Sequence, residues 1–258
     1  MDTRLDGKRA IVTAGAGGLG LAIARQLSLE GATVFVCDVD EQALAALPGE
    51  LTGARVDVSD SVALDAWLQP IIDEGIDILV NNAGIAGPTA PIEDIDDNAW
   101  RTCLSVCLDS QFYCARRVVP TMKAQKSGVI VNLSSTAGLL GMPNRAPYVA
   151  AKFAVVGLTK TLAMELGRDN IRVNAIAPGS VTGERMDRVV AAHAKAESIS
   201  PQSVTAMYNA GTSMQTFVDP EEVADMVVYL CSERGKRISG QVIGVDGHTE
   251  TLYPRSFG

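Results

Sequence analysis

The stretch Thr13-Ala14-Gly15-Ala16-Gly17-Gly18-Leu19-Gly20 is the first indication of the fold, because it follows a short apolar run and leads directly into an amphipathic segment. Glycines at these positions let the backbone turn tightly and approach a pyrophosphate at the N-terminus of a helix. A glycine-rich turn alone occurs in many proteins. Its context strengthens it here, because the next apolar run ends at Asp38, about 20 residues on, where a carboxylate can accept hydrogen bonds from ribose hydroxyl groups.

Short β-branched runs alternate with longer amphipathic stretches along the chain, which is typical of parallel strands joined by crossover helices. The expected strands are Arg9–Thr13, Thr33–Cys37, Ala54–Val58, Ile76–Val80, Val129–Leu133, Arg172–Ala177 and Gln241–Val245. Helices are expected to start near Gly18, Glu41, Ser61, Asp97, Tyr148 and Pro220. The sequence therefore predicts an α/β fold with one Rossmann-type doubly wound parallel sheet of seven strands, and a single dinucleotide-binding domain over residues 1–258.

One long segment, residues 180–218, breaks this alternation. It is rich in Ser, Met and Ala and follows the sixth expected strand. Ligands of open α/β sheets bind beyond the carboxyl ends of the strands, so we expect this segment to form a substrate lid. The alternative is a surface excursion without a function.

Charge and cysteine content limit the classes of partner. The chain carries a formal net charge of -8, which leaves no basic face for nucleic acid or an anionic membrane surface. No segment approaches the roughly 20 apolar residues of a membrane span, and the N-terminus resembles no signal peptide, so a cytoplasmic protein is expected. The cysteines lack CxxC spacing and predict reduced thiols. Cys103, Cys107 and Cys114 share one helix face, but histidine partners are scarce and no metal site is predicted.

Asp38 discriminates between the two nicotinamide dinucleotides. A 2′-phosphate would bring roughly two negative charges within a few ångströms of its carboxylate, a repulsion of about 2 kcal/mol even in a water-like dielectric. No arginine or lysine follows at Val39, and the turn carries Gly17 where a cation could bind the extra phosphate. The predicted cofactor is therefore NAD. The alternative interpretation of Asp38 is a carboxylate that merely ends a strand.

A second set of motifs lies further along the chain. Val131-Asn132-Leu133-Ser134-Ser135 ends an expected strand, and Tyr148-Val149-Ala150-Ala151-Lys152 opens an expected helix on which Tyr148 and Lys152 share a face. With the glycine-rich turn, Asn81-Asn82-Ala83-Gly84 and Pro178-Gly179, this ordered set resembles the classical short-chain dehydrogenase/reductase (SDR) family over essentially the whole chain.

The resemblance implies a nicotinamide-dependent oxidoreductase and suggests the site residues. Tyr148 matches the general acid and base, Lys152 the partner that lowers the tyrosine pKa and holds the nicotinamide ribose, and Ser135 the group that orients the substrate oxygen. Ser134 is then a scaffold residue, unless the register is off by one. The motifs and the resemblance together place at the cofactor Gly15, Ala16, Gly17, Gly18, Leu19, Gly20, Asp38, Asp57, Val58, Asn82, Ala83, Gly84, Tyr148, Lys152, Pro178, Gly179 and Val181. Relatives are mostly tetramers or dimers, which implies a homotetramer or dimer with the Asp97–Pro120 and Tyr148–Gly167 helices between subunits.

The chemistry agrees with the roles of Tyr148 and Lys152. Useful phenolate at neutral pH requires the tyrosine pKa to fall by about 3 units from its ordinary value near 10, which is about 4 kcal/mol. One ammonium group about 4 Å away, at an effective dielectric near 20, supplies about 4 kcal/mol. Tyr148 can then take the hydroxyl proton as hydride leaves the carbinol carbon for NAD, and reverse both steps.

Three positions depart from the family pattern. Ala14 stands where the first family glycine is usual, which is tolerated at a negative φ and strained at a positive φ. Cys107 stands where the family has an asparagine whose amide holds a water in a proton relay to the lysine. Either the relay is interrupted, or a neighbouring group or another water closes the path and Cys107 only packs. Thr182 lies one position before the family threonine that binds the nicotinamide carboxamide, so that role is not transferred to it.

The substrate pocket is the least defined part of the site. Met142 and Arg145, before the tyrosine helix, are candidate substrate contacts, and so are Arg185 and its neighbour Glu184 in the lid. Met207 and Met214 are further lid candidates. Polar residues on a loop are also commonly solvated, and methionine equally fills gaps in a core.

Three functions fit these residues. The first is NAD-dependent oxidation of a secondary alcohol, polyol or sugar-type hydroxyl, with ketone reduction in reverse. The second is reduction of a 3-oxoacyl thioester on an acyl carrier protein, which Asp38 disfavours and the acidic charge weakens through repulsion of an acidic carrier. The third is an NAD-binding regulator without turnover, against which the intact Ser135, Tyr148 and Lys152 argue.

Overall fold

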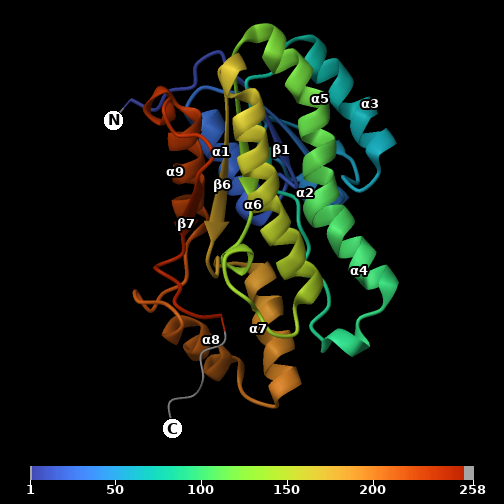
Figure 1. Ribbon diagram of the computed structural model, residues 1–258, viewed down its shortest axis with the longest axis vertical. Helices are drawn as coiled ribbons and strands as arrows, with labels where there is room; N and C mark the ends of the chain where they lie inside the picture. Colours follow the sequence, from blue (N-terminus) through green and yellow to red (C-terminus); the bar gives the residue numbers. More distant parts are fainter. Residues whose placement is uncertain (1, 253–258) are drawn as a thin grey trace.

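The computed structural model describes residues 2–252, which fold around a seven-stranded parallel sheet in the order β3-β2-β1-β4-β5-β6-β7 (Figure 1). The order reverses between β1 and β4, which makes the sheet doubly wound and places a ligand crevice at the carboxyl ends of the strands. The predicted fold class is therefore confirmed.

The strands are β1 Arg9–Thr13, β2 Thr33–Asp38, β3 Leu51–Arg55, β4 Ile78–Asn81, β5 Gly128–Leu133, β6 Ile171–Pro178 and β7 Val242–Val245. The helices are α1 Gly18–Leu29, α2 Glu41–Ala45, α3 Ser61–Asp73, α4 Asp97–Leu104, α5 Ser110–Gln125, α6 Ala146–Leu166, α7 Glu184–Glu197, α8 Pro201–Ala210 and α9 Pro220–Cys231. The helices α1, α2, α3, α4 and α9 begin where the sequence predicted them, and α6 starts at Ala146 rather than Tyr148. The starts of α5, α7 and α8 were not predicted.

Helices cover both faces of the sheet. On one face, Ile23 and Leu27 of α1 pack with Val223 and Val227 of α9 against alternate strand residues such as Val12. On the other face, α3, α5 and α6 cover the remaining strand side chains, with Leu68, Val118 and Leu166 fully or almost fully buried. Burial on both faces explains why the strands read as continuous apolar runs.

The predicted third strand, Ala54–Val58, is wrong by several residues. The observed β3 pairs Leu51 with Val34 and Arg55 with Asp38, so its register follows β2. Val56 and Val58, which suggested a strand, are buried just beyond it against the layer of α3. Burial alone produced the apolar pattern there, without strand pairing.

The helix predicted over Asp97–Pro120 is interrupted rather than continuous. A π-helical turn, Ser105–Asp109, separates α4 from α5, and α5 then runs through Pro120 to Gln125. Single π-turns occur frequently at functional sites, and this one carries Cys107.

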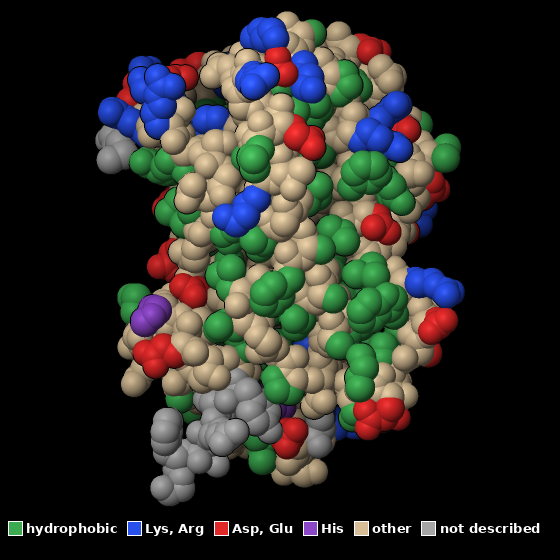
Figure 2. All heavy atoms as spheres, in the orientation of Figure 1, with side chains coloured by type: hydrophobic (Ala, Val, Ile, Leu, Met, Phe, Trp, Pro, Cys, Tyr) green, Lys and Arg blue, Asp and Glu red, His purple; other side chains and the backbone are tan. Residues whose placement is uncertain are grey.

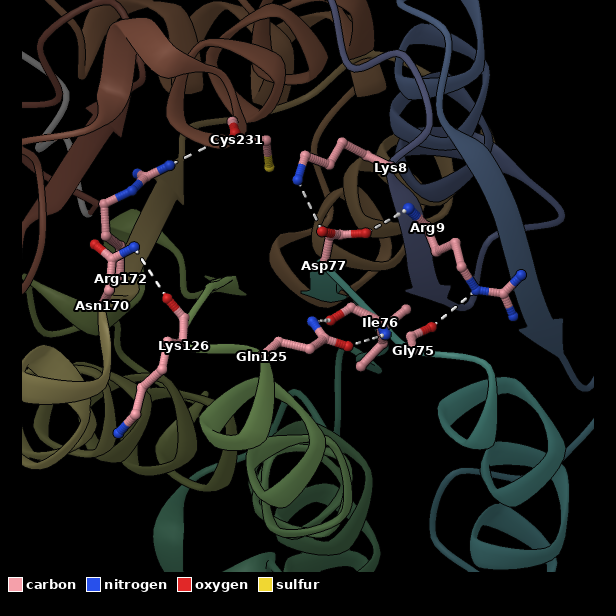
Figure 3. Close-up of polar contacts among 10 residues, drawn as sticks. All are labelled: Lys8, Arg9, Gly75, Ile76, Asp77, Gln125, Lys126, Asn170, Arg172 and Cys231. Carbon is pink, nitrogen blue, oxygen red and sulfur yellow. Dashed lines mark hydrogen bonds and ion pairs between the residues drawn. The ribbon is translucent and has the colours of Figure 1, made fainter.

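The amino ends of the strands are closed by polar contacts (Figure 3). Lys8 Nζ lies 2.9 Å from Asp77 Oδ1, and the Gln125 amide accepts the Ile76 N–H and donates to the Ile76 carbonyl. Arg172 Nη1 donates to the carbonyls of Leu230 and Gly235 at 2.6 and 3.0 Å. A hollow lies among these residues, but the Arg172 and Lys8 cations there already have partners, so this edge serves as scaffold.

Residues 180–218 form a helical unit beyond the carboxyl end of β6, where Figure 1 shows α7 and α8. Val190, Ala194 and Val204 give the unit a small core of its own, with Met186 and Tyr208 packed against it. Its two ends are joined, because Val181 and Val218 form a β-bridge and Thr182 N–H donates to the Val218 carbonyl at 2.9 Å. This is the segment predicted to be a lid.

Hydrophobic side chains gather on the face formed by α5 and α6 (Figure 2). Phe112 of α5 is 46% exposed, and Phe153 and Met164 of α6 are 45% and 84% exposed. Within residues 2–252, no helix is both long and apolar enough to cross a membrane. Most of the C-terminal end, residues 253–258, lies outside the described part of the chain.

Candidate active site

The glycine-rich turn connects β1 to α1 and holds a strained residue. Ala14 has a φ of 50°, so the departure from the family glycine is of the strained kind, which costs about 1–2 kcal/mol for a residue with a Cβ. The Asn82 amide secures the turn by donating to the Thr13 and Ala14 carbonyls, both at 3.0 Å. A Cβ on Gly20 would collide with the Ala14 carbonyl oxygen, which explains the requirement for glycine there.

The Asp38 carboxylate ends β2 and faces the same turn. Its Oδ2 accepts the Ala16 N–H at 3.1 Å, and its Oδ1 accepts the N–H groups of Val39 and Asp40 at 2.8 and 3.2 Å. These bonds fix a half-buried negative charge beside the turn. Val39 is 59% exposed and contributes no positive charge. Asp38, which is predicted to discriminate between NAD and NADP, therefore presents a carboxylate held in place by backbone N–H groups, with no cation from the residue after it.

This end of the site fits a dinucleotide. A Cβ placed on Gly17 or Gly18 would meet nothing within 4 Å, so the turn borders open space. No side chain caps the N-terminus of α1, and its free N–H groups and positive dipole end suit a pyrophosphate.

The remaining predicted cofactor residues lie at the carboxyl ends of neighbouring strands. Thr13 Oγ1 accepts the N–H groups of both Asn82 and Ala83 at 3.0 Å, which joins the end of β4 to the glycine-rich turn. Pro178 ends β6, and Val181 forms the bridge that begins the lid. Asp57 lies beyond β3, exposed, and its carboxylate accepts the Ser59 N–H at 2.9 Å.

Ser135, Tyr148 and Lys152 come together between β5 and α6. Lys152 Nζ lies 5.7 Å from the centre of the Tyr148 ring and donates to the Leu133 carbonyl at 2.6 Å, with only 3% of Lys152 exposed. Ser134 Oγ instead donates to the backbone carbonyl of Lys152 at 2.9 Å. Ser134 is thus tied to the scaffold, and Ser135 is the serine that meets Tyr148.

The pKa of Tyr148 is lowered from its ordinary value. Desolvation by burial acts against the shift, but the charges of Lys152 and Arg185 and a hydrogen bond with Ser135 lower the pKa of Tyr148 more strongly. A hydroxyl group with a lowered pKa, hydrogen-bonded to a serine and close to a buried ammonium, is suited to exchange a proton with an alcohol. The geometry is therefore of the kind that general acid and base chemistry requires.

Cys107, at the position of the family asparagine, lies next to this group but forms its hydrogen bonds with the backbone of Ile85. Its Sγ donates to the Ile85 carbonyl and accepts the Ile85 N–H, both at 3.3 Å. Hydrogen bonding from Cys103, aided by the charge of Lys152, lowers the pKa of Cys107 despite burial, and the same interaction raises the pKa of Cys103. The Gln111 amide donates to the carbonyls of Cys107 and Leu133, both at 3.3 Å. Gln111 and Lys152 thus share the Leu133 carbonyl, and Gln111 is a neighbouring group of the kind that could continue a relay.

The candidate substrate side of Tyr148 carries two arginines. The guanidinium carbons of Arg145 and Arg185 lie 5.3 and 6.0 Å from the centre of the Tyr148 ring. Arg145 is 6% exposed and donates to the Ala86 carbonyl at 2.7 Å, whereas Arg185 is exposed. Met142 is half-buried, and Met214, at 71% exposure, is largely solvated.

Sequence reasoning missed two lid residues. Tyr208 of α8 shares a hydrogen bond of 3.3 Å with His193 Nδ1 of α7, and Arg145 counteracts the rise that burial causes in the pKa of Tyr208. Spacing along the chain could not bring His193 and Tyr208 together, because the turn between α7 and α8 does so. Among residues 2–252, no group of three or more His, Cys, Asp and Glu side chains is arranged to hold a metal ion.

Known proteins resemble this chain along most of its length. The family model described as Enoyl-(Acyl carrier protein) reductase matches residues 14–248. A 3-oxoacyl-(acyl-carrier-protein) reductase of Thermotoga maritima is 33% identical, with 95% of this chain and 98% of that protein covered. A 2-keto-3-deoxy-L-fuconate dehydrogenase of Xanthomonas campestris is 35% identical, with 95% of this chain and 81% of that protein covered.

The architecture is also found in solved structures. The crystal structure of an NAD⁺-bound xylitol dehydrogenase superposes with a TM-score of 0.88 at 30% sequence identity. The superposition covers 94% of this chain and 98% of that protein. These similarities extend over the sheet, the predicted catalytic residues and the lid.

Proposed function

We propose that this chain, which belongs to the short-chain dehydrogenase/reductase family of nicotinamide-dependent oxidoreductases, transfers hydride between NAD and an alcohol. The proposed alcohol is a secondary alcohol, polyol or sugar-type hydroxyl. The observation that carries the proposal is the grouping of Ser135, Tyr148 and Lys152 with a lowered pKa at Tyr148. This grouping lies at the same sheet edge as the turn that fits a dinucleotide.

In the proposed mechanism, Tyr148 accepts the proton of the substrate hydroxyl during oxidation and returns it to the carbonyl oxygen during reduction. Ser135 hydrogen-bonds the same oxygen and orients it. Lys152 lowers the pKa of Tyr148 through its charge and is placed to bind the nicotinamide ribose. The nicotinamide ring, when bound, supplies the hydride acceptor in one direction and the hydride donor in the other.

NAD is the proposed cofactor because Asp38 is a fixed anion where the adenosine ribose is expected. Its carboxylate is held by three backbone N–H groups, so it cannot readily turn away from a 2′-phosphate. The NAD⁺-bound xylitol dehydrogenase, similar in fold, supports the same choice.

The test is an absorbance screen for NADH formation across secondary alcohols, polyols, sugars and sugar acids. We expect turnover with at least one class, its loss in Tyr148→Phe, and a lower kcat/KM with NADP than with NAD. Tight NAD binding without turnover across the panel would instead favour a regulator that kept the fold and lost catalysis.

Reduction of a 3-oxoacyl thioester is the second candidate, because the reductase of Thermotoga maritima is similar over nearly the whole chain. Asp38 weighs against it because its carboxylate disfavours NADPH. The net charge of -8 also weighs against it, because an acidic carrier protein would be repelled. Faster NADPH-dependent reduction of acetoacetyl thioesters than of any alcohol or ketone in the panel would favour this candidate.

A homotetramer or dimer is proposed through α5 and α6. The exposed Phe112, Phe153 and Met164 on these helices support an interface, because large exposed apolar surface is commonly covered by a partner. Light scattering after size-exclusion chromatography measures the mass directly. A monomer at micromolar concentration would contradict this proposal.

A further inference from the structure

Two guanidinium groups converge on the Tyr148 ring from different parts of the chain. Arg145 immediately precedes α6, and Arg185 lies in the first turn of α7 in the lid. Their guanidinium carbons lie 5.3 and 6.0 Å from the centre of the ring. Together with Lys152, they make the surroundings of Tyr148 positive in a chain whose net charge is -8.

Neither arginine has an acidic partner within residues 2–252. The ion pairs found in this part of the chain include none to Arg145 or Arg185. Glu184 is adjacent to Arg185 in sequence, but its carboxylate lies 3.7 Å from Arg188. The two cations therefore lack the carboxylate that usually accompanies a buried or clustered guanidinium.

Arg145 provides the stronger evidence, because its side chain is buried and one of its N–H donors has no hydrogen-bond partner. It is 6% exposed, its Nη2 donates to the Ala86 carbonyl at 2.7 Å, and its Nε is buried with no hydrogen-bond partner. Burial lowers the pKa of Arg145, and the charge of Arg185 adds to this effect. A buried donor without a partner is uncommon in folded proteins, and a guanidinium matches the two oxygens of a carboxylate.

We infer that Arg145 and Arg185 form a carboxylate-binding subsite and that the substrate is a hydroxy acid. The inference rests on the proposed function, since it concerns the alcohol oxidised at Tyr148. Both guanidinium groups lie close to the Tyr148 ring, so the carboxylate is separated from the carbinol carbon by only a few bonds. Tyr208 of the lid lies near enough to Arg145 for their charges to interact, and its hydroxyl shares a hydrogen bond with His193.

The experiment compares acids with neutral molecules of the same shape. The probes are short 2-, 3- and 4-hydroxy acids, their methyl esters, and glycerol 3-phosphate as an anion of different geometry. For the wild-type protein with saturating NAD, we expect kcat/KM for the best acid to exceed that for its ester by at least about 10-fold. A preference for the ester, or for the phosphate by a similar factor, would overturn the inference.

Two variants locate the subsite. Arg185 is exposed, so Arg185→Gln should fold normally. Folding of Arg145→Gln is checked by circular dichroism and by its thermal midpoint. For each variant, kcat/KM for the acid should fall at least about 10-fold more than kcat/KM for the ester, mainly through KM. Loss of the Arg185 charge also raises the pKa of Tyr148, and this effect acts on acid and ester alike. Arg188→Gln, on the same helix with the same loss of charge, is the matched control. Equal losses for acid and ester in the Arg145 and Arg185 variants would contradict the inference.

A binding measurement separates this inference from the proposed function. If no alcohol is oxidised, the proposed function fails, but the subsite can still be examined by calorimetric titration of the hydroxy acids into the NADH-loaded protein. We expect binding to the wild type, retained in Arg188→Gln and weakened at least about 10-fold in Arg185→Gln. No binding of any acid to the wild type, or equal binding to both variants, would refute the subsite even where neutral alcohols are turned over.

Discussion

Replacing Lys152 by methionine isolates the electrostatic contribution to catalysis. The ammonium lies 5.7 Å from the centre of the Tyr148 ring, and at an effective dielectric near 20 this separation corresponds to a charge interaction of about 3 kcal/mol with the phenolate. Lys152 lowers the pKa of Tyr148, so its removal raises that pKa. Oxidation requires the phenolate, so kcat/KM rises with pH through this pKa, and the acidic limb of the profile should move to higher pH in the variant.

The assay is the pH dependence of NADH formation with the best alcohol of the screen, at NAD concentrations that saturate each variant. Saturation is needed because Lys152 is also placed to bind the ribose. Lys160→Met, an exposed change on the same helix, is the control and should leave the limb in place. A shift of less than about 0.5 pH unit in Lys152→Met, or a shift to lower pH, would refute the electrostatic account of Tyr148.

Further outcomes are expected at Asp38, at the glycine-rich turn and at the Cys107–Gln111 pair. Asp38→Ser should raise the ratio of kcat/KM with NADP to kcat/KM with NAD by about 30-fold, which corresponds to the loss of about 2 kcal/mol of repulsion. An unchanged ratio would contradict the proposed role of Asp38. Gly20→Ala should lower the thermal midpoint and weaken NAD binding, because the added methyl group meets the Ala14 carbonyl. Ala14→Gly should change the free energy of unfolding by less than about 1 kcal/mol, because the strain it relieves is offset by the backbone entropy of glycine. Gln111→Leu should lower kcat more than KM, and Cys107→Asn should not raise kcat; a clear rise in Cys107→Asn would show instead that the relay is interrupted at that thiol.

Much of the fold followed from local pattern. The glycine-rich turn, the apolar runs and the start of α9 predicted the doubly wound sheet because each depends on residues close together in the chain. The third strand was misplaced because the pairing of β3 with β2 decides its register, and Val56 and Val58 are apolar for another reason.

The site was predictable where motifs are contiguous and less so where it is assembled across the fold. Tyr148 and Lys152 share a helix face, so their spacing was sufficient. The positive φ of Ala14, the π-turn at Cys107 and the approach of Gln111 to Leu133 depend on packing that no local pattern encodes. The meeting of Arg145 with Arg185 likewise depends on how the segment after β6 folds back over α6.

The β-bridge between Val181 and Val218 has a consequence for how such an enzyme can diversify. Because the bridge joins the two ends of the segment and α7 and α8 pack on a core of their own, residues 182–217 resemble an exchangeable module attached to an unchanged base. Recombination between homologues at these two points would exchange the whole proposed substrate lid in one event and leave the nucleotide half intact. Chimaeras with both crossover points at the bridge should therefore fold more often than chimaeras that divide α7 or α8.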